Sequence, residues 1–300
     1  MIRIIQTALE LGFGYAPVAI ALFLSYRILD IADLSTDGCF VLGAAVSVSL
    51  AAAGHPLLAI VLAMLCGAAV GCLSAELQTY FGIPSILAGI IVNTGLYTVN
   101  LLVMGWRSNV NLIKGESVFT MFQKTGAGAV SDIILLAAGA ALPALFLRFF
   151  LATRIGLSIR ATGDNPIMVR ASSIDPSRTI RIGLSISGAF TALSGALIGQ
   201  YQKAVDINSG TGVVVIGLAC LIIGETVLGK RSVAKSIIGA ILGSVLYRFI
   251  YAFVLYTQIV PVQGLKLLTS LIVAAAIAAP VLKEKENLRR RMRKEEENDA

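Results

Sequence analysis

The sequence predicts an all-α polytopic membrane protein with about eight or nine transmembrane helices and an internal inverted repeat. Of the 300 residues, 57% are hydrophobic and only 14% are charged. Several apolar runs approach or exceed the roughly 18 to 20 residues that cross a bilayer core. Polar segments that carry basic residues separate these runs, as expected for the loops between membrane spans.

The apolar runs divide the transmembrane region, residues 1–282, into nine expected spans. Met1 to Glu10 predicts a short interfacial helix ahead of the first span. The longest expected outer loop is Gly105–Val130, and residues 283–300 are expected to form a charged cytoplasmic tail. The expected spans are Leu11–Leu29, Cys39–Ala53, Pro56–Leu77, Pro84–Met104, Ser131–Leu151, Ile182–Gly199, Gly212–Gly229, Ser236–Leu255 and Gly264–Val281.

A repeated glycine pattern supports this count. The first copy starts inside and the second starts outside, so the two copies are inverted about the membrane plane. Inverted repeats are typical of transport folds, in which the solute path lies near the interface of the repeats. Nine spans and a cytoplasmic tail place the N-terminus outside, and a re-entrant glycine-rich segment would reverse that side. The pattern Gly38, Gly43, Gly54, Gly67 and Gly71 is echoed by Gly212, Gly217, Gly229, Gly239 and Gly243.

Composition argues against several other functions. The net charge of +7 comes largely from the loops and the tail, which favours membrane topology over nucleic-acid binding. His55 is the only histidine, so histidine-based triads and multi-histidine metal sites are not expected, and no catalytic residue or metal site is predicted. The cysteines lie in apolar segments without a C-x-x-C pair and are interpreted as packing residues: Cys39, Cys66, Cys72 and Cys220.

Polar residues at the edge of or inside apolar spans are candidates for a solute pathway. Asp33 and Asp37 precede or begin the second span, where they either line the pathway or cap the span, and capping is the favoured interpretation. Asn93, Thr94 and Tyr97 share a broad helical face with Asn100. They either contact a passing solute or hydrogen-bond between helices, and the second is the commoner situation.

Glu225 is a carboxyl group inside an apolar run. Such a group usually faces a cavity or a partner, but Glu225 also lies close enough in sequence to Lys230 and Arg231 to reach the inner interface, and both interpretations stay open. Gly224, Gly229 and Lys230 resemble the start of a P-loop. Arg231 stands where the magnesium-binding Ser or Thr is required, so ATP hydrolysis must come from another chain.

Residues 153–176 form a polar, arginine-bearing segment that we interpret as a cytoplasmic coupling loop. An Asp or Asn accepts orphan backbone N–H groups and Pro fits the first helical turn, so residues 164–166 predict the start of a short helix. This helix is expected to lie parallel to the membrane over about two turns. Ile167, Met168 and Val169 are then available to press into a partner.

The stretch G-L-S-I-R-A-T-G-D-N-P at residues 156–166 closely resembles the coupling loop in permease subunits of ABC importers for branched-chain amino acids, ribose and similar small solutes. The stretches D-L-S-T-D-G at 33–38 and G-L-Y-T-V-N at 95–100 are most similar to a subgroup associated with tryptophan or tyrosine uptake. After Pro166 the family usually carries a small or acidic residue and then Ala, where this chain has Ile167 and Met168. The resemblance implies a role in coupling to the ATP-binding subunit for Arg160, Gly163, Asp164, Asn165 and Pro166.

The resemblance also implies the partners. These are an ATP-binding subunit that holds ATP and magnesium, an extracytoplasmic substrate-binding protein, and a second permease copy or paralogue. No cofactor is implied in this chain, which would be a non-enzymatic, multi-pass protein of the bacterial inner membrane that transports an aromatic or branched-chain amino acid. An alternative is an ion-coupled secondary transporter with Glu225 and Asp33 as ion sites. A membrane-embedded enzyme lacks the clustered His, Cys or carboxylate groups that its chemistry needs.

Overall fold

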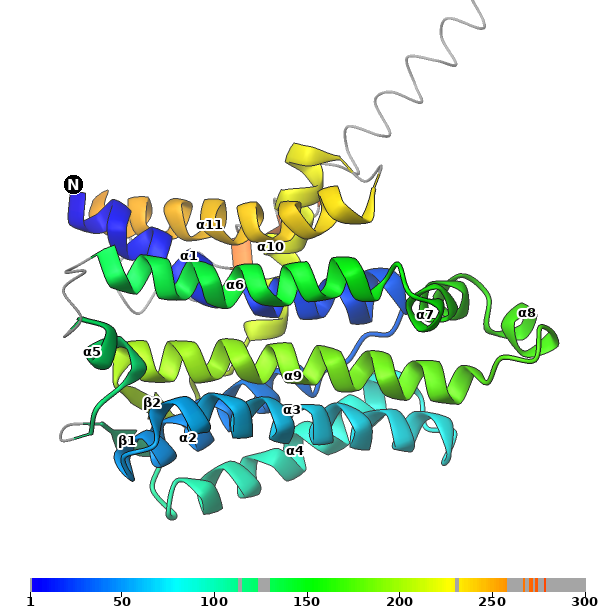
Figure 1. Cartoon of the computed structure of the whole chain (residues 1–300), viewed down its shortest axis with the longest axis horizontal. Coiled ribbons are helices and arrows are strands. Elements are labelled where there is room, and N and C mark those ends of the chain that lie inside the picture. Colours follow the sequence, from blue (N-terminus) through cyan, green and yellow to red (C-terminus); the bar gives the residue numbers. More distant parts are fainter. Residues whose placement is uncertain are drawn as a thin grey trace, which may run out of the picture.

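A computed structural model describes residues 2–112, 115–123, 130–229 and 232–257, with a few single positions between 267 and 278. These residues form a bundle of long helices that lie side by side (Figure 1). Within them, six helices are long and apolar enough to cross a membrane, and two apolar helices are shorter. The helices of the bundle are α1 (Ile2–Leu22), which continues into the π-helical segment η1 (Phe23–Ile28), α2 (Thr36–Ala52), α3 (Pro56–Thr79), α4 (Ser85–Val103), α6 (Val130–Phe150), α9 (Pro176–Gln202), α10 (Val213–Leu228) and α11 (Val233–Thr257).

The eight bundle helices coincide with the first eight expected spans, and this part of the prediction is confirmed. The ninth expected span, Gly264–Val281, falls almost wholly outside the described residues, as does the tail. The expected interfacial helix at residues 1–10 is wrong, because α1 is continuous from Ile2. No helix breaker separates Glu10 from Leu11, and the buried Glu10 carboxylate accepts hydrogen bonds from Gln6 and Tyr201.

The long outer loop is more structured than expected. It contains β1 (Asn109–Asn111) and the short helix α5 (Val118–Phe122). Strand β1 pairs antiparallel with β2 (Ala204–Asp206), with Val110 opposite Val205. These elements and the N-terminus lie at one end of the bundle, and α7 and α8, which follow α6, lie at the other (Figure 1). The N-terminus and α7–α8 thus lie at opposite ends of the bundle (Figure 1), the relation that nine spans predict.

Helix α9 forms the centre of the bundle and packs against α1, α2 and α3. Small residues allow backbones to approach closely in membrane proteins. A Cβ at Gly43 would overlap the backbone of Ala192, and one at Gly71 would overlap the carbonyl of Leu184. These glycines of the first repeat hold α2 and α3 against α9.

Candidate functional site

The short helices α2 and α10 start beside each other in the interior of the bundle. Both carboxylate oxygens of Asp37, in the first turn of α2, accept backbone hydrogen bonds from α10, one from Gly212 at 2.9 Å and one from Val214 at 2.9 Å. Gly212 adopts a left-handed conformation with φ of 85° and has no side-chain cap of its own. A carboxylate satisfies the orphan N–H groups and complements the dipole at a helix N-terminus. Asp37 therefore caps a helix, but the capped helix is α10 and not its own span.

From this junction the two helices lead to opposite ends of the bundle. The last turn of α2 lies near Gly115 in the outer loop. Near the last turn of α10, Glu225 lies beside Arg27 of η1, and η1 contacts α7. The two short helices therefore run in opposite directions from their shared junction, which agrees with the direction that an inverted repeat predicts.

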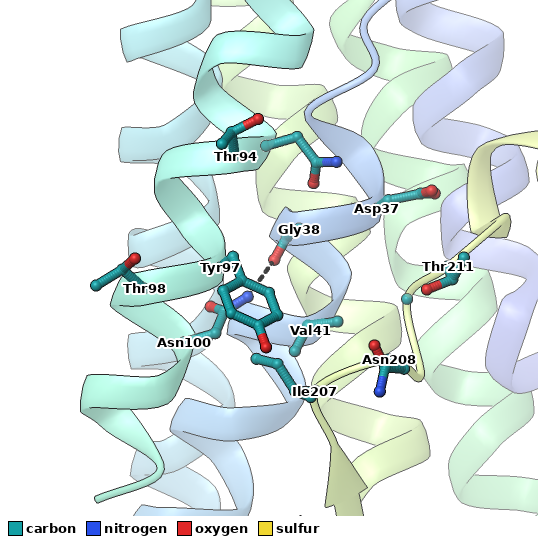
Figure 2. A pocket seen from close by; sticks show the side chains of 12 residues that line it. Asp37, Gly38, Val41, Thr94, Tyr97, Thr98, Asn100, Ile207, Asn208 and Thr211 are labelled. Atoms are coloured by element: carbon teal, nitrogen blue, oxygen red, sulfur yellow. Dashed lines mark hydrogen bonds between the residues drawn. The ribbon is translucent and has the colours of Figure 1, made fainter. Parts of the chain in front are cut away.

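A cavity of about 490 Å³ opens beside this junction, and we call it the central pocket. Figure 2 shows its walls, which come from the start of α2, from α4 and from the segment before α10. Four of the six residues predicted for the solute pathway, Asp37, Asn93, Thr94 and Tyr97, line it. The other lining residues are Gly38, Val41, Thr98, Asn100, Ile207, Asn208, Gly210 and Thr211.

Asn100 is the most buried polar side chain of the central pocket, with 2% of its surface exposed. Its Nδ2 donates to the carbonyl of Gly38 at 3.1 Å (Figure 2). Within the described residues, its Oδ1 has no hydrogen-bond partner. An unsatisfied buried acceptor costs about 1–3 kcal/mol, so this oxygen would gain a hydrogen bond if the pocket opened it to a donor of a bound solute.

The α4 wall of the central pocket also forms part of the outer surface of this chain. Tyr97 is 52% exposed, and Thr94 and Thr98 are exposed beside it. Asn208 and Thr211, on the opposite wall, were not predicted, because they fall in or beside a segment that sequence reasoning assigned to an outer loop. The glycine repeat could have indicated these residues. It aligns Gly212 with Gly38, so the segment just before Gly212 corresponds to the segment just before Gly38.

Asp33 lies outside the central pocket, in the segment between η1 and α2. Its Oδ1 accepts a hydrogen bond from the backbone N–H of Ser35 at 2.9 Å and one from the hydroxyl of Ser74 at 3.2 Å. The side chain is 5% exposed. These contacts shape the turn that leads into α2.

Glu225 also lies away from the central pocket. It is 5% exposed and forms an ion pair with Arg27 of η1, with 3.2 Å between Arg27 Nε and Glu225 Oε1. The other basic residues considered from the sequence, Lys230 and Arg231, lie outside the described residues. Glu225 thus ties the end of α10 to the end of the first span.

The coupling segment consists of two helices, α7 (Arg154–Asp164) and α8 (Pro166–Ala171). The predicted helix start is confirmed, because Asn165 Oδ1 accepts the N–H groups of Ile167 and Met168 at 3.1 Å each, with Pro166 in the first turn. Helix α7 was not expected. Thr153 caps it by accepting the N–H of Gly156 at 3.2 Å.

The implied coupling residues Arg160, Asp164, Asn165 and Pro166 are exposed on this segment. Gly163 instead faces η1, and a Cβ there would overlap the carbonyl of Ile28.

Beyond Pro166, Ile167 and Met168 are 82% and 68% exposed. The expectation that Val169 is available to a partner is wrong, because it is 4% exposed, on the face of α8 turned away from Ile167 and Met168.

A hydrogen bond of 2.8 Å between the hydroxyls of Thr162 and Thr179 joins α7 to α9.

In the described part of the chain, no group of three or more His, Cys, Asp or Glu side chains is arranged to hold a metal ion.

The apolar helices, the inverted short helices and the exposed coupling segment define a multi-pass integral membrane protein of the transport class. The chain belongs to the family described as branched-chain amino acid transport system / permease component, whose model matches residues 4–279. It is therefore a non-enzymatic permease component of an ABC-type transport system, and the ion-coupled alternative is not supported.

Three curated relatives are informative. The chain is 34% identical over 262 residues, 87% of this chain and 86% of the relative, to a tyrosine transport system permease protein of Clostridioides difficile. It is 33% identical over 231 residues, 75% of this chain and 78% of the relative, to an uncharacterised protein of Rickettsia prowazekii. It is 26% identical over 214 residues, 69% of this chain and 59% of the relative, to a fructose import permease protein of Bifidobacterium longum. No solved structure matched.

Proposed function

We propose that this chain is the permease subunit of an ATP-driven importer for an amino acid in a bacterial inner membrane, with tyrosine or another aromatic amino acid as the first candidate. The central pocket carries this proposal, because it is a polar cavity inside a transport permease. The tyrosine permease is similar to this chain over most of both lengths, which favours an aromatic amino acid over a sugar.

The chemistry of the central pocket suits a small zwitterion with a polar side chain. Asn93, Asn100 and Asn208 supply amide donors and acceptors, and the buried, unpartnered Oδ1 of Asn100 would accept from an ammonium or hydroxyl group once the pocket opens to it. The charge of Asp37 is already compensated by the N-terminus of α10. Recognition would therefore depend mainly on hydrogen bonds, with the exposed ring of Tyr97 available to stack on an aromatic side chain.

A second permease copy or paralogue would complete the site. Thr94, Tyr97 and Thr98 place polar atoms on the exposed face of a membrane helix, and polar groups in contact with lipid are costly. A partner that covers α4 would enclose the open side of the central pocket.

The coupling segment provides a surface for an ATP-binding subunit that holds ATP and magnesium. Arg160, Asp164, Asn165 and Pro166 are exposed there together with the apolar side chains of α8. An extracytoplasmic substrate-binding protein would deliver the solute to the end of the bundle opposite the coupling segment.

Contacts within the chain form a route from the coupling segment to the central pocket. Gly163 packs on the end of η1, and Arg27 of η1 is paired with Glu225 of α10. The other end of α10 is held by Asp37, which lines the central pocket. A displacement of α7 would therefore reach the pocket through η1 and α10.

The test is ATP-dependent uptake of radiolabelled tyrosine into proteoliposomes that contain the permease, its ATP-binding subunit and its binding protein. We expect uptake by the wild type, competition by unlabelled aromatic amino acids and none by fructose. Asn100→Leu should lower uptake by about tenfold or more, because one buried polar contact contributes about 1–3 kcal/mol.

The control is Asn109→Leu, an exposed asparagine in β1 that does not line the central pocket. It should leave uptake unchanged. Uptake without the ATP-binding subunit, or competition by fructose alone, would contradict the proposal.

A further inference from the structure

Arg248 is a cation inside an apolar membrane helix. It belongs to α11, whose span Val233–Tyr256 is long and apolar enough to cross a membrane. Its guanidinium carbon lies 3.9 Å from the ring centre of Tyr15 on α1 and 5.8 Å from that of Tyr251. A charged side chain in a membrane span is costly and marks a functional site unless it is paired.

Arg248 has no carboxylate partner in the part of the chain that the structure describes. The ion pairs found there involve other residues, and the buried Nε of Arg248 lacks a hydrogen-bond partner among the described residues. The sequence contains no Asp or Glu between Glu225 and Glu284. Glu10 of α1 accepts hydrogen bonds from Gln6 and Tyr201. The cation–π contacts with two tyrosines stabilise the charge but leave the guanidinium donors open.

A second cavity, of about 390 Å³, lies against Arg248 between α1 and α11, and we call it the Arg248 cavity. None of its lining residues lines the central pocket. Leu255 and Tyr256 are 39% and 55% exposed, so the cavity reaches the surface of the bundle near the ends of α1 and α11 that lie opposite the coupling segment. Its walls are mostly apolar: Ile4, Ala8, Leu11, Ala252 and Leu255, with Thr7, Tyr251, Tyr256 and Arg248 as the polar members.

We propose that the Arg248 cavity binds an anionic phospholipid of the outer leaflet, with a phosphate oxygen on the guanidinium and part of an acyl chain along the apolar walls. The planar fork of arginine matches a phosphate group, and a charge-assisted hydrogen bond would satisfy the open donors. A free soluble anion gains nothing from Ile4, Leu11 and Leu255. A lipid satisfies the cation and the apolar walls together.

The Arg248 cavity connects Arg248 to the outer end of α11. Arg248 lies nine residues before the last residue of this helix, Thr257, or about 14 Å along the axis at 1.5 Å per residue. The cavity continues from Arg248 to Leu255 and Tyr256 near that end, so a lipid phosphate that enters it meets a long arginine side chain extending toward the headgroups.

The test is native mass spectrometry of the full-length permease in mild detergent, titrated with phosphatidylglycerol or with phosphatidylcholine of the same acyl chains. We expect one tightly bound phosphatidylglycerol per chain and weaker retention of phosphatidylcholine. Arg248→Gln should weaken phosphatidylglycerol binding by about fivefold or more, as expected for the loss of one interfacial cation. Arg148→Gln removes an exposed arginine in the last turn of α6 and should leave binding unchanged.

A second variant separates the site from the stability of the fold. Ala252→Phe fills the Arg248 cavity and retains the cation, and it should also reduce phosphatidylglycerol binding while the protein elutes normally on gel filtration. Equal binding of the two lipids by the wild type, or unchanged binding in Arg248→Gln, would overturn the proposal. Displacement of the lipid by inorganic phosphate would assign the site to a soluble anion instead. None of these results depends on which solute the permease transports.

Discussion

Asp37 joins two helices whose ends lie 175 residues apart in sequence. A local N-cap needs one acceptor, and Asn serves there as well as Asp. Asp37 instead uses both oxygens, one for Gly212 and one for Val214, so an amide in its place would turn an NH2 donor toward one of these two N–H groups and would carry no charge. The side chain is therefore more constrained than its place at the start of α2 suggests.

We expect Asp37→Asn to destabilise the folded permease by about 1–2 kcal/mol, because one N–H group of α10 loses its partner and the helix dipole loses its counter-charge. Thermal unfolding in detergent measures this change. Asp175→Asn is the matched control, since Asp175 is the local N-cap of α9 and accepts one backbone N–H group, that of Ser177. Equal stability of Asp37→Asn and the wild type would rule out the bridging role.

The Arg27–Glu225 ion pair connects η1 with α10, and its buried carboxylate is 5% exposed. We expect Arg27→Ala to lower the rate of solute uptake several-fold, because the route from the coupling segment to α10 is interrupted. Basal ATP hydrolysis by the ATP-binding subunit should persist. Uptake and ATPase activity measured on the same proteoliposomes check this. Arg178→Ala removes a surface pair with Asp175 that contributes little. If both variants transport equally well, α10 is not connected to the coupling segment through this pair.

The elements of the coupling segment illustrate how contact with the bundle overrides local preference. On helix propensity alone, Gly163→Ala in α7 should stabilise the protein by up to about 1 kcal/mol. The structure predicts the opposite sign, because the added Cβ overlaps the carbonyl of Ile28. The expected loss of about 1–3 kcal/mol follows from overpacking.

Thermal unfolding of Gly163→Ala tests this prediction. Ala161→Gly, at an exposed position of the same helix, calibrates the effect of propensity alone. A melting temperature of Gly163→Ala above that of the wild type would show that α7 does not pack on η1 as described.

Most of the fold was predictable because the apolar runs of a membrane protein report directly on its helices. The starts of α3 and α4 and the cap of α8 could be read from Pro56, Pro84 and Asn165. Helix α7 was missed because its polar, arginine-bearing sequence was assigned to a loop. Its residues Gly156 and Ile159 are buried, and their burial becomes evident only when the helix is seen packed on the bundle.

The candidate site was predictable only in part. Asn93, Thr94 and Tyr97 follow from helical spacing on one span. Asn208 and Thr211 reach the central pocket because the chain returns into the interior before α10, and a local pattern contains no such information. The partner of Glu225 was missed for a related reason, since Arg27 is distant in sequence.

The junction of α2 and α10 is chemically unequal in the two halves of the glycine repeat. In the glycine repeat, Gly38 corresponds to Gly212, so Asp37 corresponds to Thr211. Two identical inverted halves would exchange conformations without a change in energy, and the permease would open equally to both sides. A carboxylate in one half and a hydroxyl in the other remove that degeneracy. The outward-facing and inward-facing conformations are therefore expected to differ in energy at this junction even before ATP is bound.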